Sequence, residues 1–185
     1  MPIFGVTASS NMSVKLTDFY QIATTTVGSG GASTIEFTSI PSTYTHLQIR
    51  GIARGTRVDT SANNQIRFNS DTGANYASHY LTGNGSSGSS GNETSSTYIY
   101  TGGLVSSLST ANSFETSVID ILDYANTNKF KTVKILSGWD ANGSGLAALW
   151  SGHWRNTNAI TSITLFPNAN GFAQYSSFQL YGVKA

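Results

Sequence analysis

The chain of 185 residues contains no cysteine, and charged residues make up only 10% of it. The absence of cysteine excludes disulfide bridges and cysteine-ligated zinc sites, so stability must come from a packed core and from subunit contacts. Soluble domains typically carry about 25% charged residues, and here Ser, Thr, Asn and Gly take their place. The surface is therefore predicted to be polar but nearly uncharged.

The net charge of +1 is also low. Arg50, Arg54 and Arg57 are spread over a predicted strand and its exit, so they cannot neutralise a run of phosphates or hold the chain on an anionic membrane. We therefore expect neither nucleic acid nor a membrane as a partner. Low charge removes much of the repulsion that keeps monomers apart, which favours an oligomer.

Long apolar runs are missing as well. Residues 1–6 lack a basic region followed by an apolar stretch, and no segment approaches the roughly 20 apolar residues of a membrane span. We therefore expect a protein that is made in the cytosol and leaves it only as part of a particle.

The chain does contain a succession of short alternating segments separated by Ser, Gly and Asn turns. In residues 44–54, Leu47 and Ile49 lie on one face of the predicted strand, and Gln48 and Arg50 lie on the other. Because no helical period intervenes, the pattern predicts an all-β fold, an antiparallel, jelly-roll-like β-sandwich with ten or eleven strands. The predicted strands span 20–27, 33–37, 44–54, 66–69, 76–81, 97–100, 114–122, 130–136, 146–154, 160–166 and 176–183.

Two glycine-rich segments are predicted to be connections. Residues 28–31 can supply the positive φ angles of a reversal, which predicts a hairpin between the first two strands. Residues 83–92 form the longest low-complexity piece, which cannot bury enough apolar surface to order itself. This second segment is predicted to be a mobile surface loop.

Residues 1–19 show neither a helical nor a strand period and are predicted to form an extended N-terminal arm before a sandwich domain of residues 20–185. Nineteen extended residues could reach about 60 Å, several times the thickness of a sandwich. A disordered or processed tail is the alternative. The apolar residues of the arm are candidates for capsid or subunit contacts: Ile3, Phe4, Val6, Leu16 and Phe19.

The polar residues offer little support for a metal site or for catalysis. Residues 140–145 begin like a calcium loop, but Ser151 stands where the bidentate acid is needed, so a hairpin turn is the better interpretation. Asp120 and Asp123 fall on opposite faces of a strand; Asp120 is expected to pair with Arg50, and Asp123 to start a turn. The three histidines are far apart, and no Gly-x-Ser-x-Gly motif occurs. We expect no metal, no cofactor and no catalytic residue.

The tryptophans form the most informative cluster of side chains. Trp150 and Trp154 share one face of the predicted strand 146–154, and Trp139 lies across the same hairpin. Large rings at such positions are typical of a packed core or a subunit contact. The alternative is a platform on which sugar rings stack.

Three longer stretches, Ser33–Gly51, Ile66–Tyr76 and Phe178–Lys184, resemble small structural proteins of tailed bacteriophages, cyanophage-like in kind. The resemblance implies a virion protein: a capsid decoration or cement protein with a jelly-roll domain, which binds the major capsid protein as a homotrimer on the outer shell. No catalytic residue is inherited from that group. The arm lies outside these stretches, and its role as a tether across neighbouring subunits is inferred from its length.

Two other classes of function compete with this one. A tail-associated or fibre module would bind host surface glycan through the tryptophans and the Asn- and Ser-rich loops. An enzyme acting on host polysaccharide would need two acidic groups a suitable distance apart, and no such pair can be assembled from Glu36, Glu93, Glu115 and the aspartates. The sequence therefore favours a structural protein, with glycan binding as the alternative.

Overall fold

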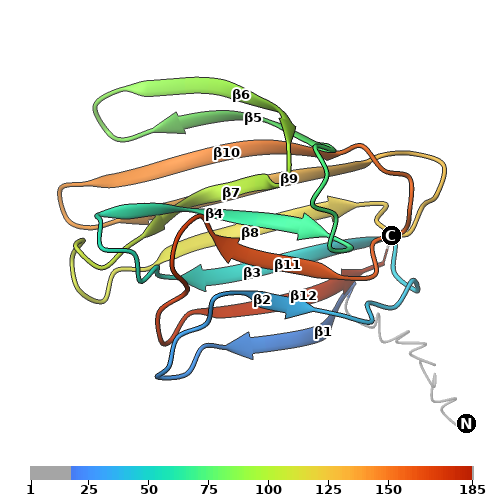
Figure 1. The fold of residues 1–185 in the computed structure, drawn as a ribbon, viewed down its shortest axis with the longest axis horizontal. Helices are drawn as coiled ribbons and strands as arrows, with labels where there is room; N and C mark the ends of the chain where they lie inside the picture. Colours follow the sequence, from blue (N-terminus) through green and yellow to red (C-terminus); the bar gives the residue numbers. More distant parts are fainter. Residues whose placement is uncertain (1–17, 185) are drawn as a thin grey trace, which may run out of the picture.

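The computed structural model describes residues 18–184, which contain twelve β-strands and no helix (Figure 1). Every strand pair is antiparallel. The strands are β1 (Phe19–Thr26), β2 (Ile35–Phe37), β3 (His46–Ala53), β4 (Ser61–Phe68), β5 (Tyr76–Gly83), β6 (Gly88–Ser96), β7 (Ile99–Val105), β8 (Glu115–Leu122), β9 (Lys131–Asp140), β10 (Gly145–Trp154), β11 (Ile163–Pro167) and β12 (Ser177–Val183).

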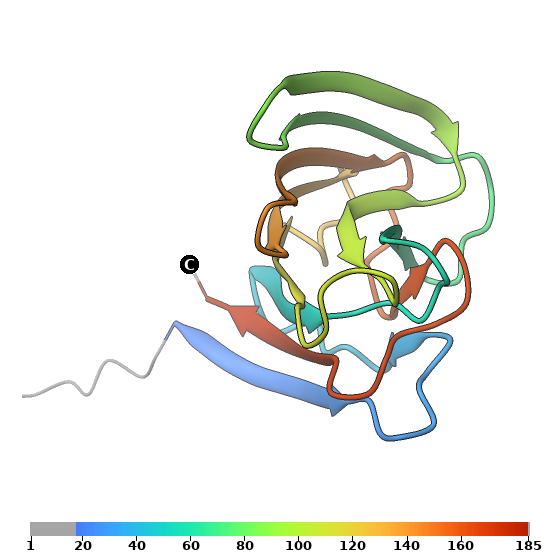
Figure 2. The same ribbon diagram turned by 90° about the vertical axis from the view of Figure 1, so that its left-hand side faces the viewer.

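The strands form two sheets of unequal size. The large sheet has eight strands in the order β1-β12-β3-β8-β9-β10-β5-β6, and the small sheet has four in the order β2-β11-β4-β7. Figure 2 shows the large sheet curving around the small one, so that one face of the large sheet is turned away from it. We call this the outer face. The predicted antiparallel β-sandwich is confirmed.

Strand alternation places the core between the two sheets. In β3, Leu47 and Ile49 point inward and are at most 1% exposed, whereas Gln48 and Arg50 point outward, as the alternation predicts. Each such apolar side chain stabilises the fold by roughly 1.5–3 kcal/mol when it is fully buried. The most deeply buried large apolar side chains include Phe68, Tyr76, Ile99, Leu104, Tyr124, Trp154, Phe172 and Phe178.

The predicted hairpin at residues 28–31 is wrong. β1 pairs with β12 in the large sheet, and β2 pairs with β11 in the small sheet. The glycines therefore carry the chain from one sheet to the other. Local turn chemistry shows where the chain can reverse, but the strand partners are decided by contacts with segments far away in the sequence.

The prediction of a mobile loop at residues 83–92 is also wrong. Residues 88–92 belong to β6, an edge strand that pairs with β5, and only residues 84–87 turn between the two strands. The Asn84 side chain accepts hydrogen bonds from the backbone amides of Ser86 and Ser87. The backbone N–H and C=O groups of β6 are paired with those of β5, so the segment is ordered although its small polar side chains bury little apolar surface.

The predicted arm falls almost entirely outside the described residues. Ile3, Phe4, Val6 and Leu16 lie in the part of the chain that the structure does not describe. Phe19, which the sequence placed in the arm, is the first residue of β1. Its ring lies 6.5 Å from that of Tyr181, measured between centroids.

Candidate functional site on the outer face of the large sheet

The tryptophans point between the sheets. Trp154 is fully buried, its indole nitrogen donates a 2.7 Å hydrogen bond to Asp71, and its ring stacks on Tyr76. Trp150 is half-buried and packs against Tyr80 with ring centroids 4.7 Å apart. An exposed sugar platform that includes Trp154 is therefore wrong, because this ring is part of the core.

Trp139 is half-buried and lines an open hollow of about 400 Å³ between the β5–β6 turn and the β9–β10 turn. One oxygen of Asp140 accepts a hydrogen bond from the amide of Asn142, and the oxygen of the Asn84 side chain caps its own turn. Among the described residues, the second Asp140 oxygen and the Asn84 amide nitrogen have no hydrogen-bond partner. The hollow thus combines an aromatic ring with one free acceptor and one free donor.

Residues 140–145 are the turn of the β9–β10 hairpin, which was the preferred interpretation of this segment. Asn142 and Gly143 occupy its centre with φ angles of 57° and 111°. Within residues 18–184 no group of three His, Cys, Asp or Glu side chains is placed to hold a metal ion. The same residues include no helix that could cross a bilayer.

Asp120 and Asp123 take part in separate networks. Asp120 lies on the outer face and accepts a 2.8 Å hydrogen bond from Gln48, which faces it directly on β3. Arg50 donates to the other end of the same Gln48 side chain, at 2.9 Å. The predicted pair between Asp120 and Arg50 is therefore wrong, because Gln48 bridges the two side chains.

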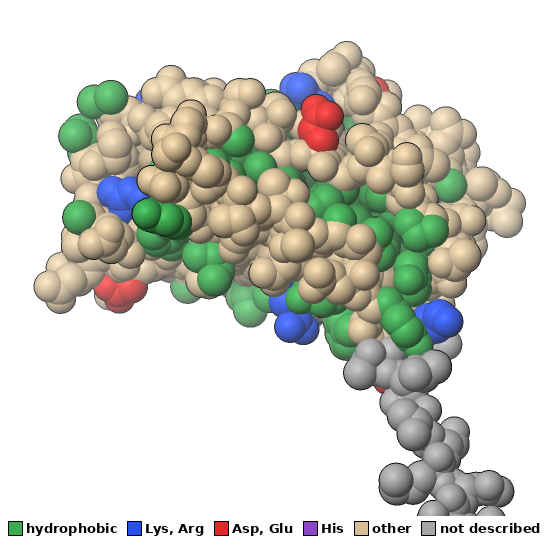
Figure 3. Space-filling view, turned by 90° about the horizontal axis from the view of Figure 1, so that it is seen from below, with side chains coloured by type: hydrophobic (Ala, Val, Ile, Leu, Met, Phe, Trp, Pro, Cys, Tyr) green, Lys and Arg blue, Asp and Glu red, His purple; other side chains and the backbone are tan. Residues whose placement is uncertain are grey.

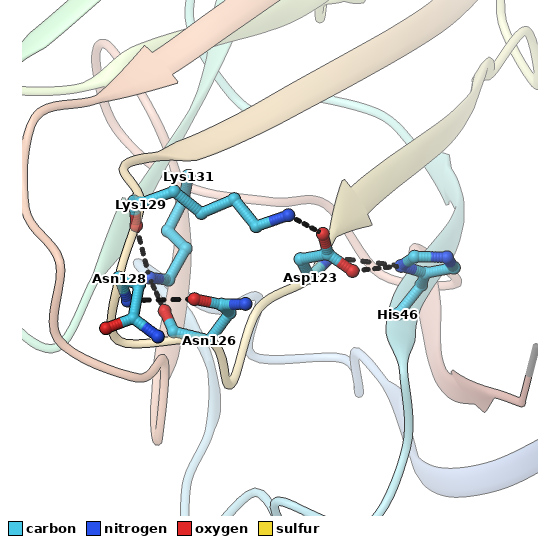
Figure 4. A network of polar contacts seen from close by, with 6 residues as sticks. All are labelled: His46, Asp123, Asn126, Asn128, Lys129 and Lys131. Carbon is cyan, nitrogen blue, oxygen red and sulfur yellow. Dashed lines mark hydrogen bonds and ion pairs between the residues drawn. The ribbon is translucent and has the colours of Figure 1, made fainter.

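Asp123 fixes the turn after β8 (Figure 4). Lys129 donates to its carboxylate, and this hydrogen bond is the main reason that the pKa of Asp123 lies below its ordinary value. The backbone amide of Asp123 donates to Nδ1 of His46 at 3.0 Å. Nδ1 of His46 is therefore the acceptor in this contact. The network holds the turn between β8 and β9.

A lysine and a glutamate side chain are fully buried, which the sequence did not predict. Lys131 donates to the backbone carbonyls of Asn126, Lys129 and Thr157 (Figure 4 draws the first two), so its ammonium group replaces water with three protein acceptors. Burial lowers the pKa of Lys131. The second side chain is that of Glu115.

Glu115 lies on the inner face of β8, and neither of its carboxyl oxygens has a well-formed hydrogen bond. Burial raises the pKa of Glu115 well above its ordinary value, and the hydroxyl of Ser117 opposes this only in part. Gly102 lies close to Glu115 and Ser137 and has a φ of 142°. Only glycine fits here, since a Cβ at this position would lie 2.7 Å from the Cβ of Ser137. Glu115 is therefore neutral across a wider pH range than an exposed glutamate.

The outer face carries apolar side chains that the core does not require. Val118, Leu136, Leu149 and Leu81 lie directly opposite one another on the neighbouring strands β8, β9, β10 and β5. Their exposed fractions are 37%, 61%, 43% and 59%. We call this continuous line, four strands wide, the apolar ridge.

A second line of residues runs parallel to the ridge, two positions further along each strand. It consists of Thr116, Gly138, Ala147 and Gly83, which are also paired directly across the four strands. We call it the small-residue row. Because its side chains are short, the surface beside the ridge is hollowed, with depressions of about 380 Å³ near Leu149 and about 260 Å³ near Val118.

Charges near the ridge are few. On the outer face of β9, Lys134 lies on one side of the ridge, and Asp140 lies beyond the small-residue row on the other side. Asp120 lies opposite Lys134 on β8, and Arg50 lies opposite Val118 at the β3 end of the ridge. On the face of the molecule in Figure 3, seen from the β1 side, charged side chains are likewise scattered in a mainly uncharged surface. Such a surface can be dried by contact with little loss of charge hydration.

Comparison of the chain with protein-family models, with curated proteins and with solved structures found no match. The outer face of the large sheet, with its apolar ridge and small-residue row, is therefore the main evidence about function.

Proposed function

We propose that this protein is a structural virion protein, a capsid decoration or cement protein that binds and stabilises a phage head shell through protein–protein contacts. The apolar ridge carries the proposal. Soluble monomers seldom leave large side chains lined up on one surface unless that surface binds something. A rigid sandwich holds the ridge in place, so little conformational entropy is lost on binding.

The expected partner is the major capsid protein, with the decoration protein bound as a homotrimer on the outer shell. A shell under internal pressure gains from many modest contacts that symmetry repeats, because linked weak sites give high overall avidity. The low charge of the chain supports this role, since nearly uncharged seams cost little to desolvate.

The proposal is tested first by the copy number of the protein in purified virions, measured against the major capsid protein by quantitative mass spectrometry. A copy number comparable to that of the shell protein supports decoration of the head. A few to a few dozen copies would move the protein to the tail, and absence from the particle would reject a virion role.

A second test asks whether the ridge contributes to the particle. Leu136→Ser together with Leu149→Ser is expected to lower the temperature at which decorated heads release their DNA. Leu108→Ser is the matched control, because Leu108 is 64% exposed but lies outside the ridge. Equal release temperatures for the ridge variant and the control would contradict a role of the ridge in shell binding.

A tail-associated module that binds host glycan is the second candidate, and the hollow at Trp139 favours it. An aromatic ring beside a free carboxylate oxygen and a free amide nitrogen can stack on a sugar and bind its hydroxyl groups. Asp140→Ala is expected to reduce adsorption of virions to host cells, whereas a shell role alone predicts unchanged adsorption. Unchanged adsorption would remove this candidate.

A further inference from the structure

We infer that the outer face is a twofold interface between two copies of this chain, in which the apolar ridge of each copy lies against the small-residue row of the other. The inference rests on the proposed function only in treating the ridge as a protein-contact surface. It deepens that function, because the ridge would then stabilise the shell by joining neighbouring copies of this chain, so the partner that the ridge contacts is a second copy.

The ridge and the row are arranged for this contact. They cross the same four strands and run parallel, two residues apart. A twofold axis that lies in the interface, between the two lines and parallel to them, brings Leu136 over the partner's Gly138 and Leu149 over the partner's Ala147. The same operation brings Val118 over the partner's Thr116 and Leu81 over the partner's Gly83. Each large side chain thus meets a short one and enters a hollow.

One symmetry operation satisfies both halves of the contact. An isologous interface requires a surface that is complementary to itself, and a ridge beside a parallel hollow has this property. The strands of the two copies then run within about 30° of each other, which is the usual angle between aligned sheets that pack face to face.

Two charged residues of β9, Lys134 and Asp140, are placed to pair across the same twofold axis. Along β9, residues 134, 136, 138 and 140 share the outer face, and the axis crosses at position 137. Lys134 therefore faces the partner's Asp140, and Asp140 faces the partner's Lys134. Two ion pairs flank the apolar contact and set its register, although exposed pairs of this kind contribute little free energy individually.

The contact is small, which predicts a weak dimer. Seven residues along a strand at about 3.4 Å each, across four strands at about 4.8 Å spacing, cover about 450 Å² of each copy. The total of about 900 Å² lies below the 1,200–2,000 Å² of stable interfaces. The dimer should therefore form in the micromolar to millimolar range, and copies held side by side on a shell would form it more readily.

Sedimentation of the full chain tests the inference, over concentrations from about 1 μM to about 1 mM. We expect a reversible monomer–dimer equilibrium. Gly83→Leu should remove the dimer, because a Cβ at Gly83 meets no atom within 4 Å in the monomer but would fill the space that the partner's Leu81 occupies. Gly30→Leu is the matched control, since Gly30 is equally open and lies far from the interface in the chain.

A charge swap tests the register independently of packing. Lys134→Asp alone should weaken the dimer by about tenfold, because the new carboxylate of each copy then faces Asp140 of the other copy. Both the single and the double variant place this carboxylate opposite Asp120 of the same copy, so the difference between them reports the contact with the partner. The double variant Lys134→Asp with Asp140→Lys should restore most of the affinity. Thermal melts of every variant check that the fold is intact.

The inference is overturned by a chain that stays monomeric throughout this range, or by a dimer or larger oligomer that Gly83→Leu and the charge reversal leave unchanged. Virion assays separate it from the proposed function. Gly83→Leu protein that cannot dimerise but still decorates heads would leave the shell role standing, whereas a normal dimer on a protein absent from virions would reject the shell role alone.

Discussion

Each strand of the large sheet contributes alternate residues to the inner and the outer face, yet the apolar residues of the two faces need different explanations. On the inner face, Ile119 and Ile135 are fully buried against the small sheet. Their immediate neighbours Val118 and Leu136 are also apolar but point outward. Burial in the core explains the first pair of side chains and cannot explain the second. The difference indicates that the outer apolar residues are there for contacts outside the monomer.

The largest expected effect comes from a matched pair of substitutions in β9. Ile135→Ala should reduce the free energy of unfolding by about 2–5 kcal/mol, because it removes a fully buried side chain and leaves a cavity. Leu136→Ala should change it by no more than about 0.5 kcal/mol, since this side chain is 61% exposed. Urea unfolding at a protein concentration too low for dimers measures both. Equal losses would show that the outer leucine also supports the monomer.

The two lysines of β9 sharpen the comparison with charged side chains. Lys131→Met should destabilise the fold by about 2–4 kcal/mol, because three backbone carbonyls lose their buried donor. Lys134→Met, on the outer face, should have an effect below about 1 kcal/mol. The midpoints of chemical unfolding give the two values. A mild effect of Lys131→Met would mean that water can reach the carbonyls after all.

The sequence was sufficient for the fold class but not for the strand partners. Alternation in residues 44–54 placed Leu47 and Ile49 inside correctly, because a half-buried strand repeats every two residues. It could not show that β1 pairs with β12 or that β6 joins the large sheet, since composition says nothing about distant backbone partners. Serine and glycine in β6 form a strand because β5 lies beside them.

The candidate site was predictable only in part. The apolar doublet Ile135–Leu136 breaks the alternation, and so does Val118–Ile119, which was a readable sign that one residue of each doublet points outward. That these outward residues fall in line with Leu149 depends on the register of the sheet, which no single strand reveals. Burial of Trp154 likewise depends on the β4 and β5 residues that surround it.

Substitutions of two glycines compare a crowded position next to Glu115 and Ser137 with an open one. Gly102→Ala should cost about 1–3 kcal/mol, because alanine is strained at a φ of 142° and its Cβ would meet Ser137. Gly30→Ala, at an open position without positive φ, should be neutral or stabilise the fold by up to about 1 kcal/mol. Thermal unfolding of the two variants provides the comparison. If both variants melt like the parent chain, the close approach of β7 to β9 is not essential.

The smallest expected effect is a gain in stability, and it depends on pH. Burial raises the pKa of Glu115 in the folded chain above its ordinary value of 4.5, so the folded state holds the proton more tightly than the unfolded state. Below that ordinary value both states are protonated, and the buried carboxyl causes no loss. As the pH rises above it, the unfolded state releases the proton first, and stability falls until the pH passes the folded pKa.

Glu115→Gln removes this titration while it keeps the shape of the side chain. The variant should therefore be more stable than the parent chain at about pH 8, and the advantage should shrink towards zero at about pH 4. Urea unfolding at both pH values measures the advantage. An advantage that is the same at both would mean that water or a rearranged Ser117 solvates the carboxylate inside the folded protein.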